Sequence, residues 1–304
     1  MQAARTQRSV PRPDPLRVAF VLLSVVCSVL VSALLKLAPR RRVDLAQAVT
    51  WNYLAAALLC VALLQPPLAA LRSAQTPWLA LLGLAVLLPA LFLVLGRAVA
   101  LAGIVRTDAA QRLSLLLSLA AAFALFGERA NGYKLAGLML GLLAIAGIGH
   151  RPEPVPAGTP RAAPWLLLVW AGFAAIDVLL KRIAQAGTPF AASLLVAFAI
   201  AFVLLLGVQL WRHVRGIRPL AWRNVGAGLL LGTLNFGNIA FYVRAHQALP
   251  DSPAVVFAAM NLGVIVLGAL LGVLAFGEKT SAWNRAGLLA ALLAIVLIAV
   301  GARG

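Results

Sequence analysis

Apolar residues occur along this chain in long runs that short polar breaks separate. The runs are apolar on every face and lack the period-two alternation that membrane β-strands show. About 20 apolar residues cross roughly 30 Å of hydrocarbon as a helix, so the pattern predicts about ten transmembrane helices. We place them near residues 16–38, 46–64, 78–102, 107–126, 132–149, 164–184, 188–210, 223–246, 252–275 and 282–301.

The composition supports a membrane environment for these runs. Hydrophobic residues make up 63% of the 304 residues, charged residues only 11%, and the mean hydropathy is +0.98. A soluble core of this size could not hide so much apolar surface. The expected fold class is therefore an all-α polytopic membrane protein. Arginines precede the first run, which is too long for a signal peptide, so we interpret that run as an uncleaved first span.

Two halves of the chain repeat the same short motifs 150 positions apart. A fourth run ends in each half on Phe126-Gly127-Glu128-Arg129 or Phe276-Gly277-Glu278-Lys279, and the fifth opens with Ala136-Gly137-Leu138 or Ala286-Gly287-Leu288. This indicates a duplication, with five-helix repeats at 16–149 and 164–301 and a Pro-rich linker at 150–163. Two like halves are the usual construction of secondary transporters.

The formal net charge of +18 does not favour a nucleic-acid partner. Most basic residues fall in short connections between spans, where they would face lipid headgroups. The expected partners are the bilayer and a small-molecule substrate. Basic residues are shared almost equally between the two sets of connections, so the charge bias does not orient the protein.

The sequence shows no sign of a cofactor or of catalytic machinery. Cys27 and Cys60 lie inside apolar spans, where a small packing residue is the favoured interpretation. Zinc-ligand spacing, a Walker lysine loop and a Gly-x-Ser-x-Gly elbow are absent from the sequence. We therefore expect neither a metal nor an enzyme.

Polar residues inside the spans are the candidates for function, because an unpaired charge in hydrocarbon costs at least ~2–3 kcal/mol. In the first span Ser28, Ser32 and Lys36 follow one another at four-residue intervals and share a helix face. In the sixth span Asp177 and Lys181 stand four apart. They either neutralise each other locally or line the mouth of a cavity, and both alternatives stay open.

The eighth span carries the most polar face of the chain. Asn235, Asn238, Tyr242 and His246 recur there every three or four residues. Amides can also join helices, at roughly 1 kcal/mol each, but four polar groups on one face favour a surface that contacts substrate. The other candidates for the cavity are Asn52, Tyr53, Gln111, Arg112 and Asn261.

The charges at membrane depth suggest the sign of the substrate. Five cations lie within or near span ends, against Asp108 and Asp177; they are Lys36, Arg97, Arg112, Lys181 and Arg244. A cavity of that sign concentrates anions. We therefore expect a carboxylate- or phosphate-bearing metabolite of amphipathic character.

The repeated Gly127-Glu128 and Gly277-Glu278 pairs are expected to be structural. Each glutamate stands just past an apolar run, where its carboxylate can accept hydrogen bonds from the backbone that starts the next helix.

The doubled Gly-Glu pair that closes each fourth span, with the Ala-Gly-Leu that opens each fifth, resembles the EamA-type members of the drug/metabolite transporter superfamily. The resemblance implies ten helices in two inverted five-helix repeats around a central cavity. It further implies an inner-membrane protein with both termini in the cytoplasm that exports or exchanges small metabolites.

The sequence thus predicts a secondary transporter that works by alternating access. An integral-membrane enzyme acting on a lipid-linked substrate and a non-transporting membrane scaffold are the alternatives. The scaffold would need no aligned polar faces, and the enzyme would need clustered catalytic groups.

Overall fold

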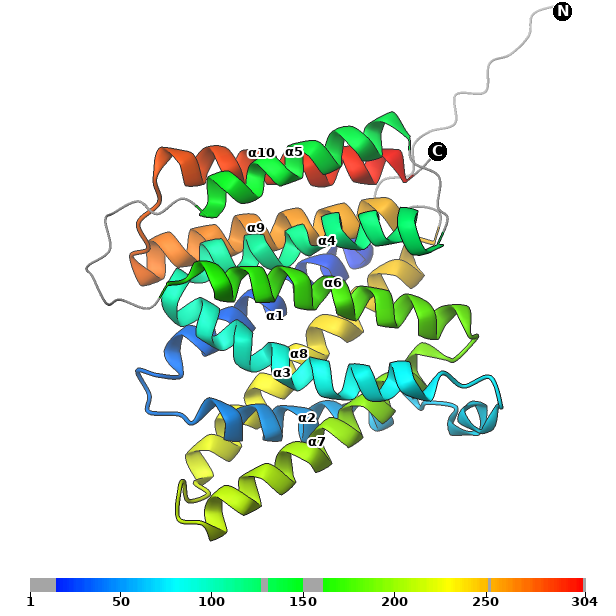
Figure 1. The fold of residues 1–304 in the computed structure, drawn as a ribbon, viewed down its shortest axis with the longest axis vertical. Helices are drawn as coiled ribbons and strands as arrows, with labels where there is room; N and C mark the ends of the chain where they lie inside the picture. Colours follow the sequence, from blue (N-terminus) through cyan, green and yellow to red (C-terminus); the bar gives the residue numbers. More distant parts are fainter. Residues whose placement is uncertain (1–14, 127–130, 150–160, 251–252, 303–304) are drawn as a thin grey trace, which may run out of the picture.

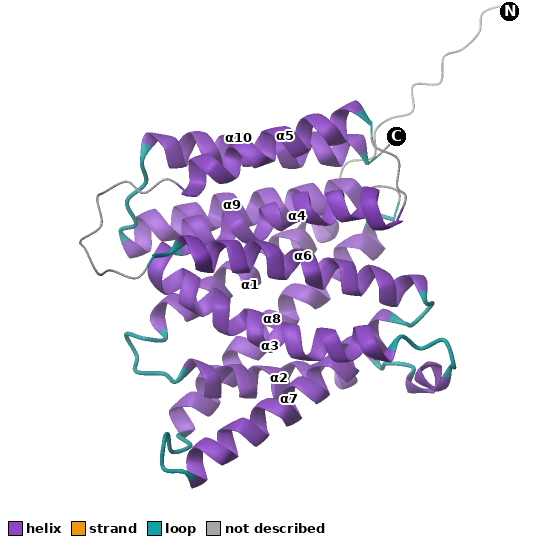
Figure 2. Ribbon diagram, in the orientation of Figure 1, coloured by secondary structure: helices purple, strands orange, loops and turns teal. Residues whose placement is uncertain are grey.

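The computed structural model describes residues 15–126, 131–149, 161–250 and 253–302 (Figure 1). These residues form ten α-helices and one short 3₁₀ helix, and no strand occurs among them (Figure 2). The elements are α1 (Pro15–Leu37), α2 (Leu45–Leu64), η1 (Leu68–Arg72), α3 (Trp78–Ala102), α4 (Ile104–Phe126), α5 (Gly132–Gly149), α6 (Ala163–Gln185), α7 (Phe190–Val214), α8 (Trp222–Ala248), α9 (Pro253–Phe276) and α10 (Ala282–Gly301).

The all-α membrane fold predicted from the sequence is confirmed. Nine of the described helices are long and apolar enough to cross a membrane, and α5 is a shorter apolar helix. The largest difference from the predicted spans is at α7, which continues to Val214 instead of ending near residue 210. Leu, Trp and Gln continue the helix there before the basic residues begin, and the aqueous end of the helix carries Arg212. Helix η1 has no counterpart in the sequence prediction.

The helices run back and forth, so their connections gather at two ends of the molecule (Figure 1). The α1–α2, α3–α4, α7–α8 and α9–α10 connections lie at one end, on the left of Figure 1, which we call the α1–α2 end. The α2–α3 and α6–α7 connections lie at the opposite end, which we call the α6–α7 end. Helix α1 begins at the α6–α7 end and α6 begins at the α1–α2 end, so the two five-helix sets run in opposite directions.

Most packing joins one half of the chain to the other. The α5–α10, α2–α7 and α4–α9 pairs each match a helix with its counterpart five helices later. The α1–α8 contact has a counterpart in α6–α3, and α1–α9 has one in α6–α4. Neither half therefore encloses the centre of the bundle by itself.

Small residues explain the closest of these pairs, α5 with α10. A Cβ added to Gly287 would lie 2.7 Å from the backbone nitrogen of Ile148, and one added to Gly147 would lie 3.0 Å from the Gly287 Cα. The Asn284 side chain donates to the carbonyl oxygens of Gly147 and Ile148 at 3.1 and 3.0 Å. Two helices approach this closely only where small residues stand at their point of contact.

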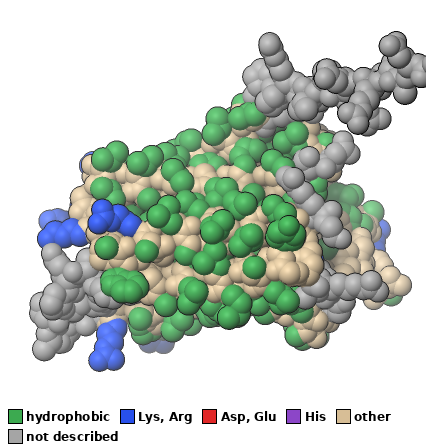
Figure 3. All heavy atoms as spheres, turned by 90° about the horizontal axis from the view of Figure 1, so that it is seen from above, with side chains coloured by type: hydrophobic (Ala, Val, Ile, Leu, Met, Phe, Trp, Pro, Cys, Tyr) green, Lys and Arg blue, Asp and Glu red, His purple; other side chains and the backbone are tan. Residues whose placement is uncertain are grey.

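The outer surface suits a lipid environment. Large apolar side chains such as Leu79, Leu143 and Leu274 are well exposed, and hydrophobic side chains cover much of the face in Figure 3, whereas Lys and Arg gather mainly at the α1–α2 end. An exposed apolar band of this extent would be unfavourable in water. The described residues thus belong to a multi-pass membrane protein.

Candidate functional site: a central cavity between the two halves

A cavity of about 210 Å³ lies in the middle of the bundle, between helices of both halves. Helices α1, α2, α3, α4, α6, α7 and α8 contribute to its wall, through Ser28, Val31, Ser32, Tyr53, Leu84, Leu88, Leu91, Phe92, Leu95, Gln111, Phe173, Ile176, Leu180, Phe190, Leu194, Phe198, Asn235, Asn238 and Ile239. Phe190 is the first residue of α7. The cavity therefore runs from the centre of the bundle toward the α6–α7 end.

One side of the cavity is aromatic and apolar. The Tyr53 ring stands edge-on to Phe92, with ring centroids 6.2 Å apart, and it lies 5.9 Å from Phe198. The Tyr53 hydroxyl is buried and has no hydrogen-bond partner. Because an unpaired buried hydroxyl is unfavourable, this group is well placed to bond a molecule in the cavity.

The polar part of the lining comes mainly from α1, α4 and α8. Ser28, Ser32, Gln111, Asn235 and Asn238 are its polar members. One turn from Ser28, the Ser24 hydroxyl lies 2.9 Å from both the side-chain and the backbone oxygen of Asn238. This contact fixes α1 against α8, so part of the polar face of α8 joins the helices while the rest borders the cavity.

Arg112 is the cation nearest to this polar wall. Its Nη2 donates to the Ser28 hydroxyl at 2.7 Å, and its Nε is buried without a partner. The guanidinium interacts electrostatically with Asp108, Tyr242 and Asp177. A guanidinium is tolerated at this depth because carboxylates flank it and because its side chain is only partly buried.

Asp108 lies behind the polar wall and is 2% exposed. The Ser32 hydroxyl donates to its Oδ1 at 2.6 Å, whereas its Oδ2 is buried without a partner. The carboxylate rests against Gly268 of α9, where an added Cβ would lie 2.5 Å from Oδ2. The glycine therefore makes room for the carboxylate in the interface of α1, α4 and α9.

Asp177, on α6, is accessible at membrane depth. It accepts a hydrogen bond from the Ser118 hydroxyl at 2.6 Å and interacts electrostatically with Arg112 and Tyr242. These partners place it on the inner side of α6, where a charged group needs water or protein contacts.

Tyr242 packs on His246, with ring centroids 4.4 Å apart, and a ring nitrogen of His246 lies 3.0 Å from the Tyr242 carbonyl oxygen. Both residues stand in the last two turns of α8, nearer to the α6–α7 end than the lining residues Asn235 and Asn238.

The structure places six of the candidate cavity residues in the lining: Ser28, Ser32, Tyr53, Gln111, Asn235 and Asn238. Arg112 bonds to that lining, whereas Asp177, Lys181, Tyr242 and His246 stand outside it. Asn52 is buried between α2 and α8 with no partner for its side-chain amide, and Asn261 donates to the Phe257 carbonyl oxygen of its own helix. The part of the chain that the structure describes contains no cluster of three His, Cys, Asp or Glu side chains that could hold a metal.

Several lining residues carry no polar signal that the sequence could have shown. They are leucine, isoleucine and phenylalanine side chains of α3, α6 and α7, including Phe92, Phe173 and Phe198. In sequence they are identical in character to residues that face lipid. Only the packing of the halves reveals which face of each helix turns inward.

Lys36 and Glu278 form an ion pair at the α1–α2 end, away from the cavity. Lys36 Nζ lies 3.2 Å from Glu278 Oε1. The same carboxylate accepts hydrogen bonds from the backbone N–H groups of Ile104 and Val105 at 2.7 and 3.1 Å. Glu278 therefore caps the start of α4, where the helix dipole also favours a negative charge.

We expected the Glu278 carboxylate to accept hydrogen bonds from the start of the helix that follows it, α10, and this expectation is wrong. Helix α10 is instead capped by Ser281 and Asn284, whose side chains bond each other's backbone N–H at 3.1 Å. Gly277 (φ +64°) ends α9 and turns Glu278 inward, toward Gly103 (φ +86°). A Cβ on Gly103 would lie 2.6 Å from the Glu278 carboxyl carbon, so this approach requires glycine. Gly127 and Glu128 lie outside the described residues.

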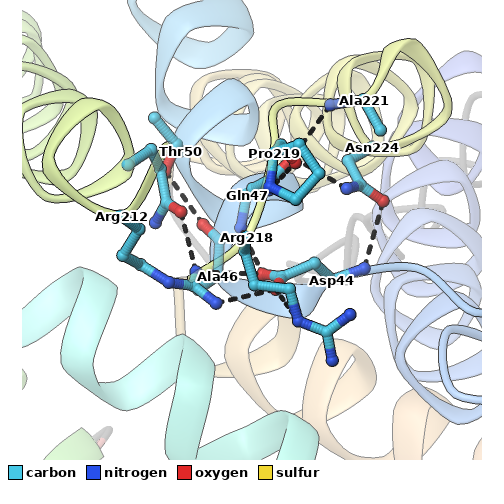
Figure 4. A network of polar contacts seen from close by, with 10 residues as sticks. Asp44, Ala46, Gln47, Thr50, Arg212, Arg218, Pro219, Ala221 and Asn224 are labelled. Atoms are coloured by element: carbon cyan, nitrogen blue, oxygen red, sulfur yellow. Dashed lines mark hydrogen bonds and ion pairs between the residues drawn. The ribbon is translucent and has the colours of Figure 1, made fainter. Parts of the chain in front are cut away.

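A second polar network, which the sequence did not reveal, joins α2, α7 and α8 at the α1–α2 end (Figure 4). Asp44 caps α2 by accepting from the Gln47 N–H and pairs with Arg212, whose Nη1 and Nη2 lie 3.3 and 2.9 Å from its two oxygens. Asn224 donates to Gln47 Oε1 at 2.8 Å and accepts from the Asp44 N–H at 3.1 Å. We call Asp44, Gln47, Arg212 and Asn224 the α2–α7–α8 network.

Opposing effects act on the Asp44 carboxyl. Burial by itself raises its pKa, but the hydrogen bonds from Arg212 and the Gln47 N–H and the charges of Arg212 and Arg218 outweigh burial. The resulting pKa lies below the ordinary value of an aspartate. Asp44 is therefore held as a carboxylate in the folded protein.

Known proteins resemble this chain in both sequence and fold. The sequence model of the EamA-like transporter family matches residues 16–149. An uncharacterized protein of Haemophilus influenzae is 37% identical over 283 residues, which cover 90% of this chain and 95% of that protein. A protein of known crystal structure superposes with a TM-score of 0.59 at 20% identity, over 94% of this chain and 98% of that one. At that identity the last likeness concerns the fold alone.

Proposed function

Since the chain belongs to the EamA-like transporter family of the drug/metabolite transporter superfamily, we propose that it is a secondary transporter of a small anionic metabolite. The observation that supports this most is the central cavity, whose polar wall is joined to Arg112 through Ser28. A cavity that both inverted halves must complete suits alternating access, because rocking of one half against the other would change which end is open.

The two sides of the cavity favour an amphipathic substrate. Phe92, Phe198 and the Tyr53 ring would contact an apolar portion, and the unpartnered Tyr53 hydroxyl would bond a polar atom near it. Arg112, Ser28 and the amides of α8 would hold a carboxylate or a phosphate. A cationic substrate would be repelled by the Arg112 guanidinium.

The described conformation has its closed end at α1–α2. Glu278 with Lys36 joins the α9–α10 connection to α1 and α4, and the α2–α7–α8 network joins the other helices there. We infer that both sets of contacts separate when the cavity opens to this end. By resemblance to the family, the protein resides in the inner membrane with cytoplasmic termini, so the described cavity would face the cytoplasm.

Purified protein tests the proposal in two steps. A thermal-stability screen against carboxylates, phosphates and quaternary ammonium compounds should select anions, since binding to the folded state raises the apparent stability. The selected anion should then move saturably, without chemical change, in proteoliposomes. Chemical conversion of the solute would favour a membrane enzyme, and neither binding nor movement would favour a scaffold.

Arg112→Gln should weaken binding of the selected anion by about tenfold or more, because it removes a charge-assisted hydrogen bond. Arg97→Gln is the matched control, since Arg97 is exposed and lies outside the cavity lining. Equal effects of the two substitutions, or saturable movement of a quaternary ammonium compound that neither changes, would contradict an anion site at Arg112.

A further inference from the structure

We propose that Asp108 is the proton-binding site of this transporter and that its protonation controls how strongly Arg112 attracts an anion. The inference rests on the proposed transport function and extends it to the coupling ion. Two features of the described residues lead to it: one oxygen of a buried carboxylate has no partner, and one guanidinium faces two carboxylates.

Of the three carboxylates that the structure describes in this part of the bundle, Asp108 has the poorest set of donors. Glu278 receives two backbone N–H bonds and the Lys36 ammonium, and Asp177 is accessible and bonded to Ser118. Asp108 has a single hydroxyl donor and a buried bare oxygen. A proton on this carboxyl group removes the charge that the surroundings stabilise least.

The charges around Asp108 also leave room for a proton. On its own helix, Asp108 interacts electrostatically with Arg112. Arg112 also interacts with Asp177 of α6, so its positive charge serves two carboxylates. On the α9–α10 connection, Asp108 faces the Glu278 carboxylate, which forms an ion pair with Lys36 of α1. Helix α9 presents Gly268 to it and contributes no charge there. One guanidinium cannot neutralise both aspartates, so protonation of Asp108 balances the group.

A route for the proton leads through Ser32. This residue lines the cavity and its hydroxyl lies 2.6 Å from Asp108 Oδ1. In the transfer, Ser32 gives its hydroxyl proton to the Asp108 carboxylate and takes one from cavity water. The O–H bond of serine is thereby replaced, the aspartate becomes a neutral acid, and the water is left as hydroxide, or as water if it arrived as hydronium.

Protonation would couple to substrate through Arg112. With Asp108 neutral, the guanidinium has only Asp177 as a nearby counter-charge and attracts an anion at the cavity wall more strongly. Release of the proton restores the second carboxylate and weakens that attraction. Proton and anion would therefore bind together, and anion affinity should rise as the pH falls, by at most about tenfold per pH unit for one proton.

Infrared difference spectroscopy of the full chain in lipid tests the proton site without any substrate. Wild type should lose a carboxylic acid band as the pH rises from about 5 to about 9. Asp177→Asn, the matched control, should keep a transition of this kind, displaced to lower pH because Arg112 then faces only Asp108. Asp108→Asn should lack it. If Asp108→Asn does not fold, Asp177→Asn is labelled with ¹³C-aspartate instead. The label should shift the frequency of the carboxylic acid band, which identifies the band as that of an aspartate. Persistence of the transition in folded Asp108→Asn, or an unshifted band, would overturn the proposal.

A second measurement tests the coupling, with phenyl phosphate as the probe. Stabilisation of wild type by phenyl phosphate should grow as the pH falls, beyond the change that the probe's own protonation causes in Asp108→Asn. An identical pH dependence in both proteins, or no stabilisation at any pH, would overturn the link between Asp108 and Arg112. A failure of transport in proteoliposomes leaves the infrared result readable, so the two proposals fail separately.

Discussion

The two ends of the bundle differ in the kind of side chain that lies there. At the α1–α2 end, charged and amide side chains join helices through short hydrogen bonds, in the Glu278 cap of α4 and in the α2–α7–α8 network. Toward the α6–α7 end, the cavity lining includes the apolar residues Leu84, Leu180 and Phe190. Hydrogen bonds between helices hold them in one relative position. Apolar contacts permit small displacements of the helices without leaving a polar group unpaired.

This contrast fits the alternating access that we propose. Polar contacts at an aqueous boundary exchange protein partners for water at small net cost, so they can hold an end closed and still release it. Apolar residues at the open end can pack together when the halves rock, since their contacts need no specific direction.

The largest expected effect is that of Glu278→Ala, which removes the cap of α4 and the ion pair with Lys36 at the α1–α2 end. It leaves the Ile104 and Val105 N–H groups and Lys36 without their carboxylate, which should lower the free energy of unfolding by about 3 kcal/mol. Thermal unfolding in detergent measures this. Glu278→Gln should lose less, because its amide oxygen still accepts from the backbone. Unchanged stability in Glu278→Ala would show that the cap does not hold the two halves together.

A smaller loss is expected when the α2–α7–α8 network is opened. Asp44→Asn or Arg212→Gln should each cost about 1–2 kcal/mol, and the double substitution should cost less than their sum, because both remove the same pair. Arg215→Gln, on the exposed side of the same helix end, is the control. Additive losses in the double variant would mean that the Asp44–Arg212 pair does not stabilise this end.

Cysteine labelling distinguishes the two ends without a large change in stability. Single cysteines at Leu180 and Asn235 should react with a small water-soluble thiol reagent, because both positions line the cavity. Cysteines at Leu35 and Val99, which are buried at the α1–α2 end, should react slowly. After Asp44→Asn is added, faster labelling at Leu35 would indicate that the network keeps this end closed, and equal rates at all four positions would contradict the contrast between the ends.

The smallest expected effect is a dependence of the free energy of unfolding on pH in the acidic range. The folded-state pKa of Asp44 lies below its unfolded value of about 3.9, so the stabilisation by this group is complete above the unfolded pKa. It is lost as the pH falls through the folded pKa. The difference in apparent Tm between wild type and Asp44→Asn should therefore shrink under strongly acidic conditions. A constant difference through that window would show that Arg212 does not favour the ionised form.

Length and uniform apolarity were sufficient to determine the number of helices and, to within a few residues, their ends. The opposed direction of the two halves was implied by the family resemblance. A run such as 78–102 has no alternative in a bilayer, because every backbone N–H and C=O group there must find a partner within its own helix. The four-residue spacing of Ser28 and Ser32 also identified the inner face of α1, since a polar stripe is costly against lipid.

Only the tertiary structure decided which partners these groups have. Lys36, predicted for the cavity, instead pairs with Glu278 from the other half of the chain, and Glu278 caps α4 in place of the helix next to it. Phe92 and Phe198 face the cavity although their sequence context matches that of lipid-facing residues. Spacing along one helix fixes which residues share a face. Partners such as Ser24 and Asn238, which stand 214 positions apart, are set by how the two halves pack, and no local pattern encodes that.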